Sequence, residues 1–166
     1  MMMRVRWRHL LAMGIAAAVL VLAACGASSA ASGSTVVKTK SVSLNGTSTT
    51  VLADTSGRTL YYFMPDTAAS VACTNSCTSL WPPLLLASGD PASSDSLSGT
   101  LSVMQGANGR QVTYNGHPLY TYSKDSGSGD ALGEGILGKW FVATGDIPAL
   151  SGSGAQPSPT SGGYNY

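Results

Sequence analysis

Two segments of the sequence, 59 residues apart, repeat each other without a gap: Gly57-Arg58-Thr59-Leu60-Tyr61-Tyr62-Phe63-Met64-Pro65-Asp66 and Gly116-His117-Pro118-Leu119-Tyr120-Thr121-Tyr122-Ser123-Lys124-Asp125. At the same offset Trp81 falls on Trp140, although the chain has only three tryptophans. A glycine, a leucine, a tyrosine, a second aromatic residue, an aspartate and a tryptophan therefore match in one register. Such a repeat predicts one fold built from two similar halves.

Each copy has the pattern of a β-strand that follows a turn. A turn signal precedes an aromatic, β-prone run that ends at the aspartate. Because side chains alternate along a strand, Tyr61 should share a face with Phe63, and Tyr120 with Tyr122, while Leu60 points to the other face. Other runs of this kind predict further strands at Val36–Leu44, Ser48–Ala53, Thr100–Met104, Gln111–Tyr114, Pro118–Tyr122 and Lys139–Thr144.

The connecting segments complete the predicted fold. Asn115-Gly116 is a strong hairpin signal. Trp81-Pro82-Pro83 does not fit a central strand, because two prolines remove two donors from the ladder. The stretch Ala87–Gly99 is predicted to be a loop, and one helical turn is expected around Cys73–Leu80. The sequence thus predicts a single small all-β domain with half-repeats at about 48–84 and 107–143, and one short helical turn near the cysteine pair.

The first 24 residues have the pattern of an export signal. Arg4, Arg6 and Arg8 precede an uncharged run that ends at Ala24. This run has about 15 residues, whereas a membrane-spanning helix needs about 20. The run leads into Leu22-Ala23-Ala24-Cys25-Gly26, which resembles a bacterial lipobox, so we expect cleavage before Cys25 and lipid attachment to it. An ordinary cleaved signal with an incidental cysteine is the alternative.

Removal of the signal changes the charge of the protein. The full chain has nine Lys and Arg and eight Asp and Glu, and three of the basic residues lie in the signal, which leaves a net charge of −2. Without a basic block the sequence does not predict a nucleic-acid binder. Small polar residues dominate 25–34 and 149–166, which are predicted to be a flexible tether and a disordered tail. The folded domain is expected at 35–148.

Cys73 and Cys77 remain as a pair once Cys25 is assigned to a lipid. Exported proteins fold in an oxidising compartment, and one helical turn brings residues four apart within disulfide range. A structural disulfide is therefore predicted. A redox-active pair is the alternative, although such pairs usually have two intervening residues and this one has three.

The repeated residues resemble those of a known family. Tyr61, Phe63 and Asp66, with their counterparts in the second copy, are similar to the Tyr-x-aromatic-x-x-Asp motif of bacterial secreted-repeat predicted lipoproteins. The resemblance covers about residues 45–145 and implies export, lipid attachment and a repeated fold, but this family has no established activity. The repeat-motif residues are Gly57, Leu60, Tyr61, Phe63, Asp66, Trp81, Gly116, Leu119, Tyr120, Tyr122, Asp125 and Trp140.

Candidate catalytic and metal-binding residues are few. His117 is the one histidine outside the signal and follows a predicted turn, where a histidine is usually solvated, so no enzyme activity and no cofactor are expected. Asp125, Asp130 and Glu134 offer oxygen ligands for a cation such as calcium. Their spacing does not match an EF-hand loop, and an ordinary acidic turn is the preferred interpretation. Asp66 and Asp125 are expected to accept hydrogen bonds from turn N–H groups.

The aromatic residues leave the function open. They are expected to form the core, with a carbohydrate or peptide platform, or a route for electrons, as alternatives. The sequence predicts a cell-envelope protein that is anchored to the membrane through Cys25 and acts as a non-catalytic binding or structural module. An envelope protein or polymer is the expected partner. A redox or electron-transfer accessory lipoprotein is the alternative function.

Overall fold

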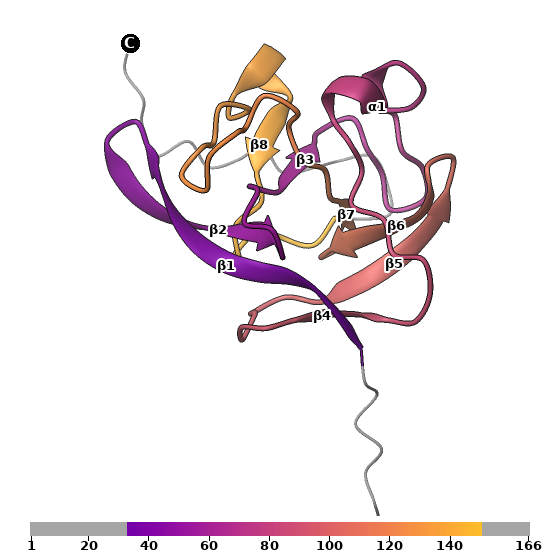
Figure 1. Ribbon diagram of the computed structural model, residues 1–166. Helices are drawn as coiled ribbons and strands as arrows, with labels where there is room; N and C mark the ends of the chain where they lie inside the picture. Colours follow the sequence, from indigo (N-terminus) through magenta and orange to yellow (C-terminus); the bar gives the residue numbers. More distant parts are fainter. Residues whose placement is uncertain (1–32, 151–166) are drawn as a thin grey trace, which may run out of the picture. The chain divides into compact units, whose positions relative to one another are not determined.

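The computed structural model describes residues 33–150 and contains two antiparallel hairpins (Figure 1). Strands β1 (Ser34–Leu44) and β2 (Thr47–Asp54) form the first, and β5 (Leu101–Gly106) and β6 (Gly109–Tyr114) the second. The β1–β2 turn is Asn45-Gly46, with φ of 50° and 82°. Asparagine and glycine tolerate this left-handed backbone best, which is why they close a two-residue hairpin.

Short elements follow each hairpin. In the first half these are β3 (Tyr61–Phe63), helix α1 (Cys77–Leu80) and β4 (Pro91–Ser93). In the second half they are β7 (His117–Pro118), the 3-10 turn η1 (Ile136–Gly138) and β8 (Trp140–Val142). The strands form three small sheets with the orders β2-β1-β4, β3-β8 and β5-β6-β7. The chain is thus mostly β, as the sequence predicts.

The two halves are intertwined, because each tryptophan segment pairs with the other half. The Met64 N–H donates to the Lys139 carbonyl at 2.9 Å, and at equivalent positions the Ser123 N–H donates to the Leu80 carbonyl at 2.9 Å. On the dyad between the halves, Tyr61 and Tyr120 exchange two backbone hydrogen bonds of 2.8 and 2.9 Å. Each half therefore completes the sheet of its partner, and the structure confirms a fold of two related halves.

The predicted alternation of side chains separates the interior into two clusters. Tyr61, Phe63, Tyr120 and Tyr122 lie in one cluster with the two tryptophans. Their neighbours along the chain lie in the other cluster, whose buried members are Val37, Leu52, Leu60, Tyr62, Leu86, Val112, Tyr114, Leu119, Ala143 and Ile147. Both clusters contain fully buried side chains. The two faces of the short segment around β3 therefore each contribute to a core.

One loop prediction and one strand prediction were wrong in detail. The predicted loop Ala87–Gly99 contains β4, which pairs in parallel with β1 and gives that edge a partner. The predicted strand Pro118–Tyr122 continues β7 only through isolated bridges at Tyr120. The reason lies in its partner: the Thr121 N–H donates to the Pro82 carbonyl at 2.8 Å, but Pro82 has no N–H to return.

The turns and boundaries show smaller differences. Asn115-Gly116 forms the predicted hairpin turn between β6 and β7, with φ of 49° and 85°. The helical turn begins only at Cys77, because Asn75 has a left-handed φ of 55°. Ser34, predicted to be tether, begins β1. Leu150, predicted to be tail, donates its N–H to the Asn115 carbonyl at 2.8 Å.

The predicted export signal and Cys25 lie outside the described residues. Within 33–150, no helix is long and apolar enough to cross a membrane.

Candidate functional site

Each motif tyrosine is hydrogen-bonded to the motif aspartate of the other half. The Tyr61 hydroxyl donates to Asp125 Oδ2 at 2.6 Å, and the Tyr120 hydroxyl donates to Asp66 Oδ2 at 2.8 Å. Both phenol side chains are fully buried, and the carboxylates are 3% exposed at Asp66 and 7% at Asp125. We refer to Tyr61–Asp125 and Tyr120–Asp66 as the crossed pairs.

The remaining oxygen of each carboxylate holds the loop that follows it. Asp66 Oδ1 accepts from the Ala72 N–H at 2.7 Å, and Asp125 Oδ1 accepts from the Leu132 N–H at 3.0 Å. These bonds are of the type that the sequence predicts, although they span six and seven residues and not a tight turn. Each aspartate therefore fixes its own loop with one oxygen and the other half's tyrosine with the second.

Burial shifts the titration of these groups. Loss of solvent raises the pKa of the Asp66 carboxyl to about 6, against an ordinary value of 3.8, and its hydrogen bonds with Ala72 and Tyr120 offset only part of this shift. Burial also raises the pKa of the Tyr61 and Tyr120 hydroxyls, and hydrogen bonding to a carboxylate raises both further. The phenols consequently stay protonated and act as donors.

A stack of four aromatic rings lies beside the crossed pairs. Its centre is Trp81 on Trp140, with ring centroids 3.7 Å apart and planes within 1° of parallel. Phe63 stacks on the outer side of Trp140 at 4.2 Å, and Tyr122 on the outer side of Trp81 at 4.3 Å. Members of the two halves alternate across this dyad, so the ring stack is itself a junction between the repeats.

The tyrosines of the crossed pairs contact the stack edge-on. The Tyr61 ring lies 5.4 Å from the Trp81 ring at 78°, and the Tyr120 ring lies 5.2 Å from the Trp140 ring at 88°. Gly133 covers this arrangement, since an added Cβ would lie 2.8 Å from both the Trp81 and Tyr61 rings. Only glycine lets the backbone approach so closely, and the Gly133 N–H uses the approach to donate to the Tyr61 hydroxyl at 3.2 Å.

The cysteine pair is joined in a disulfide. Cys73 and Cys77 have Cα atoms 5.3 Å apart, within the usual range for the bond. Cys73 is fully buried in the cluster that contains the ring stack, with Cys77 packed against it. The disulfide therefore closes the loop whose N–H groups hold Asp66.

The residues singled out as cation ligands have separate partners. Asp130 Oδ2 accepts from the Ser126 and Gly127 N–H groups at 2.8 and 2.7 Å, and Glu134 Oε2 accepts from the Val142 N–H at 2.7 Å. In the described range no group of three or more His, Cys, Asp or Glu side chains is placed to hold a metal ion. Asp130 therefore holds a turn of its own loop, and Glu134 holds strand β8.

His117 is not the solvated turn residue that its position suggested. It is 3% exposed, its ring lies 4.9 Å from the Tyr62 ring, and its Nε2 is 3.0 Å from the Pro148 carbonyl oxygen. Burial lowers the pKa of its imidazole. The segment after β8 folds back over the hairpin turn and covers it, which the local sequence does not reveal.

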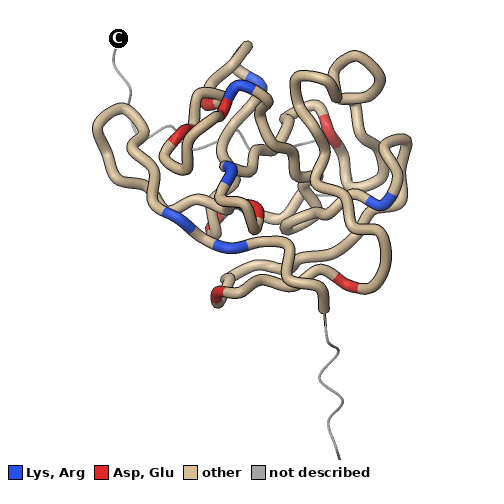
Figure 2. Tube along the Cα trace, viewed as in Figure 1, with Lys and Arg blue, Asp and Glu red and all other residues tan. Residues whose placement is uncertain are grey.

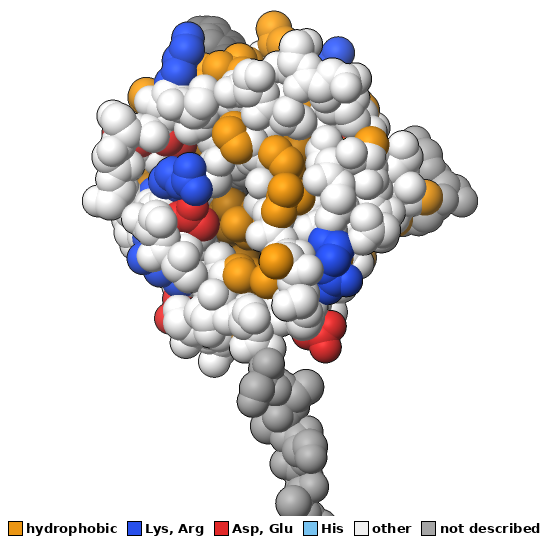
Figure 3. All heavy atoms as spheres, turned by 45° about the vertical axis from the view of Figure 1, so that its right-hand side comes forward, with side chains coloured by type: hydrophobic (Ala, Val, Ile, Leu, Met, Phe, Trp, Pro, Cys, Tyr) orange, Lys and Arg blue, Asp and Glu red, His pale blue; other side chains and the backbone are white. Residues whose placement is uncertain are grey.

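The surface carries other candidate features. A groove of about 690 Å³ lies beside β2, and its lining includes the hydroxyl side chains of Thr39, Ser48, Thr49, Thr50, Ser96, Ser98 and Thr144. Charged residues are spread along the chain trace (Figure 2). Hydrophobic side chains reach the surface in the middle of one face (Figure 3). Across the described residues, the exposed large hydrophobic side chains are Leu80, Leu85, Leu132 and Leu137.

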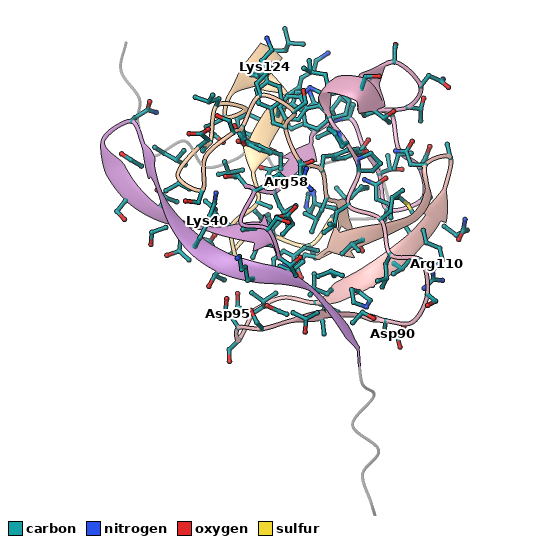
Figure 4. The ribbon with its side chains drawn as sticks, viewed as in Figure 1. Lys40, Arg58, Asp90, Asp95, Arg110 and Lys124 are labelled. Atoms are coloured by element: carbon teal, nitrogen blue, oxygen red, sulfur yellow. A yellow bond between two sulfur atoms is a disulfide. The ribbon has the colours of Figure 1, made fainter. Side chains whose placement is uncertain are left out.

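Charged side chains near β1 mainly hold loops in place. Lys40 extends from β1 towards the turn that carries Arg58 (Figure 4) and donates to the carbonyls of Gly57 and Ser128 at 2.9 and 2.8 Å. Burial lowers the pKa of its ammonium. Asp54 accepts from the Arg58 backbone N–H at 2.9 Å and from the Arg58 side-chain Nε at 2.8 Å, so an ion pair helps to hold the turn between Asp54 and Arg58.

Sequence reasoning did not predict the crossed pairs or the ring stack. The repeat places tyrosine and aspartate five residues apart in each copy, which suggests a local role for both. One feature of the sequence could have indicated a contact between the copies. Each copy has one motif tyrosine, a hydrogen-bond donor, and one motif aspartate, an acceptor, although the chain has few charged residues.

Comparison with known proteins supports this two-fold organisation. A family model described as a secreted repeat of unknown function matches residues 43–85 and again residues 102–144. Comparisons with curated proteins and with solved structures gave no match. The two matched segments begin within the hairpins and end just after the tryptophan segments, so they coincide with the two intertwined halves. The chain belongs to the family of secreted repeats of unknown function.

Proposed function

We propose that this secreted-repeat protein is lipid-anchored in the cell envelope through Cys25 and acts as a non-catalytic binding or structural module. The crossed pairs carry the proposal. Their polar atoms, the most chemically distinctive of the repeat, are hydrogen-bonded to each other and buried inside the domain. Because the motif residues join the two halves, they favour a rigid module whose outer surface is available to a partner.

An envelope protein or polymer is the proposed partner, and the groove beside β2 is the proposed contact surface. Its hydroxyl groups suit a neutral, hydrogen-bonding ligand, and Asp146 contributes the one charged side chain of the lining. Membrane attachment through two or more acyl chains, each stabilised by about 0.8 kcal/mol per buried methylene, would hold the module at the envelope.

The anchor is tested first, with the full chain expressed in a bacterial host. We expect the mature protein to begin at Cys25, to carry a lipid mass and to partition into detergent. Cys25→Ala should release the protein or stall its maturation. Intact mass measurement decides the matter, and an unmodified N-terminus at another residue would contradict the anchor.

The partner is tested by crosslinking and capture from solubilised envelope with the lipidated protein. Ser98→Trp, which fills the groove, should reduce capture of a specific partner, whereas Ser126→Trp on the acidic loop should not. Equal capture by both variants would show that the groove is not the contact surface.

A redox accessory protein is the second candidate function, and the ring stack is the observation that favours it. Four rings with centroid separations of 3.7 to 4.3 Å give electrons a continuous path through the interior. Thiol titration and the absorbance of the purified protein test this candidate. A titratable pair at Cys73 and Cys77 or a copurifying chromophore would support it.

A further inference from the structure

The crossed pairs combine a phenol, a base and an indole at contact distance. Tyr61 has its hydroxyl 2.6 Å from an Asp125 oxygen and its ring against Trp81. Tyr120 repeats the arrangement with Asp66 and Trp140. The two indoles are in turn stacked on each other, so both crossed pairs connect to one Trp81–Trp140 pair.

A buried phenol in this fold does not need a carboxylate for its hydrogen bond. Tyr114 is also fully buried, and its hydroxyl donates to the Gly145 carbonyl at 2.7 Å. A carboxylate is a costly alternative, because burial disfavours its charged form. The raised pKa of Asp66 reflects that cost. The use of a carboxylate in both halves therefore suggests a need for a base beside the phenol.

That need arises when a phenol loses an electron. The oxidised phenol is a strong acid, so the electron leaves far more readily if a base accepts the proton in the same step. A positioned base within hydrogen-bond distance accelerates proton transfers of this kind. Both crossed pairs meet this geometric requirement, with oxygen–oxygen distances of 2.6 and 2.8 Å.

We propose that Tyr61 and Tyr120 are one-electron, one-proton donors that quench oxygen-centred radicals, and that the Trp81–Trp140 pair carries the electron out. This inference rests on the second candidate function and deepens it. Tyr61 and Tyr120 are fully buried, so a radical at the surface would take the electron through the ring stack without contacting either of these two tyrosines. Tyr122 and the half-buried Phe63 end the stack on its two sides.

One crossed pair reduces one radical in two electron transfers. An oxygen-centred radical takes one electron from the stacked indoles and becomes an anion, which leaves an indole radical cation. Tyr61 returns an electron to the indole while its phenolic proton moves to Asp125. The Tyr61 O–H bond breaks and an O–H bond forms on Asp125, which gives a neutral tyrosyl radical, a neutral carboxylic acid and an intact indole.

The test is photochemical oxidation of the full chain by ruthenium(III) tris-bipyridine, a one-electron oxidant, with electron paramagnetic resonance to identify the radical. The wild type should yield tyrosyl radical, formed more slowly in deuterated water. Asp125→Asn keeps an acceptor oxygen but removes one base. Because both crossed pairs supply the same Trp81–Trp140 pair, tyrosyl radical should still form, at about half the wild-type rate. The Asp66→Asn/Asp125→Asn double variant should slow tyrosyl formation about tenfold or more.

Tyr61→Phe/Tyr120→Phe should remove most of the rapidly formed tyrosyl signal and prolong the indole radical, whereas Tyr114→Phe, the matched control, should behave as the wild type. Near-ultraviolet circular dichroism establishes that each variant is folded, and the single variants serve if a double variant unfolds. The proposal is overturned if folded Asp→Asn variants form tyrosyl radical at the wild-type rate and yield, or if Tyr114→Phe removes as much signal. Neither result would affect detergent partition or partner capture, which test the leading function.

Discussion

The two halves of the domain share their contacts with each other and differ in how each holds its own loop. In the second half, Trp140-Phe141-Val142 forms strand β8, and the otherwise unpaired Val142 N–H donates to half-buried Glu134. The first half has Trp81-Pro82-Pro83 at the equivalent positions. Pro83 has no N–H, so no acceptor is needed there, and Asn75 stands at the position equivalent to Glu134.

The loops between strand and tryptophan differ in the same way. Cys73 and Cys77 form a disulfide in the first half, and the positions 59 residues later hold Leu132 and Ile136. The second loop relies instead on carboxylates, with Asp130 and Glu134 accepting backbone N–H groups. The crossed pairs and the tryptophan stack are therefore the shared part of the repeat, and the means of closing each loop is the variable part.

The shared part should show the largest effect, and the same effect from either half. Trp81→Ala and Trp140→Ala each remove a buried indole from one stack, and each should lower the free energy of unfolding by about 3–5 kcal/mol. Chemical denaturation of both variants measures the loss. A cost confined to one half would break the comparison, because it would show that one tryptophan packs independently of the other.

The covalent closure of the first loop should have a smaller effect. Replacing Cys73 and Cys77 with Ser should cost about 2 kcal/mol by the chain-entropy estimate for so small a loop and leave the fold recognisable. Alkylation of the native protein without reductant should label neither cysteine. If both cysteines are alkylated under oxidising conditions, the first loop has no disulfide and, like the second loop, is closed by non-covalent contacts.

The first half should also respond to pH through Asp66. Its pKa is about 6 in the folded protein against 3.8 ordinarily, so the folded state binds this proton more tightly than the unfolded state. The free energy of unfolding should therefore be highest near pH 4 and fall by about 1–3 kcal/mol as the pH rises past 6.

Asp66→Asn should remove most of this slope, which denaturant titrations at pH 4 to 7 measure. Lys124→Gln serves as a control, because Lys124 is exposed and is not a hydrogen-bond partner of Asp66. Parallel profiles for the wild type and Asp66→Asn would show that Asp66 does not cause the pH dependence.

The smallest effect is expected at Glu134, which accepts the Val142 N–H in the second half. The first half has Pro83 at the position equivalent to Val142 and needs no such acceptor. Glu134→Ala leaves the Val142 N–H without its partner and should cost about 1–2 kcal/mol. Glu134→Gln keeps an acceptor oxygen and should cost much less. Thermal unfolding of both variants separates the cases, and equal losses would show that the side chain matters through its charge or packing and not through this hydrogen bond.

The sequence predicts the parts of this structure that depend on local pattern. Alternation placed Tyr61 and Phe63 opposite Leu60, and Asn115-Gly116 closed the expected hairpin. The candidate site depends on contacts between residues more than 50 positions apart, such as Tyr120 with Asp66, which no local pattern encodes. His117 was misjudged for the same reason, since the chain around Pro148 that buries it is distant in sequence.

The central claim, that each motif tyrosine pairs with the aspartate of the other half, is tested most directly by double-mutant cycles on chemical denaturation. Tyr61→Phe is combined with Asp125→Asn in one cycle and with Asp66→Asn in another. We predict a coupling energy of about 1–3 kcal/mol for Tyr61 with Asp125, and near-additivity, within about 0.5 kcal/mol, for Tyr61 with Asp66. Stronger coupling of Tyr61 to Asp66, the aspartate of its own half, would contradict the crossed arrangement.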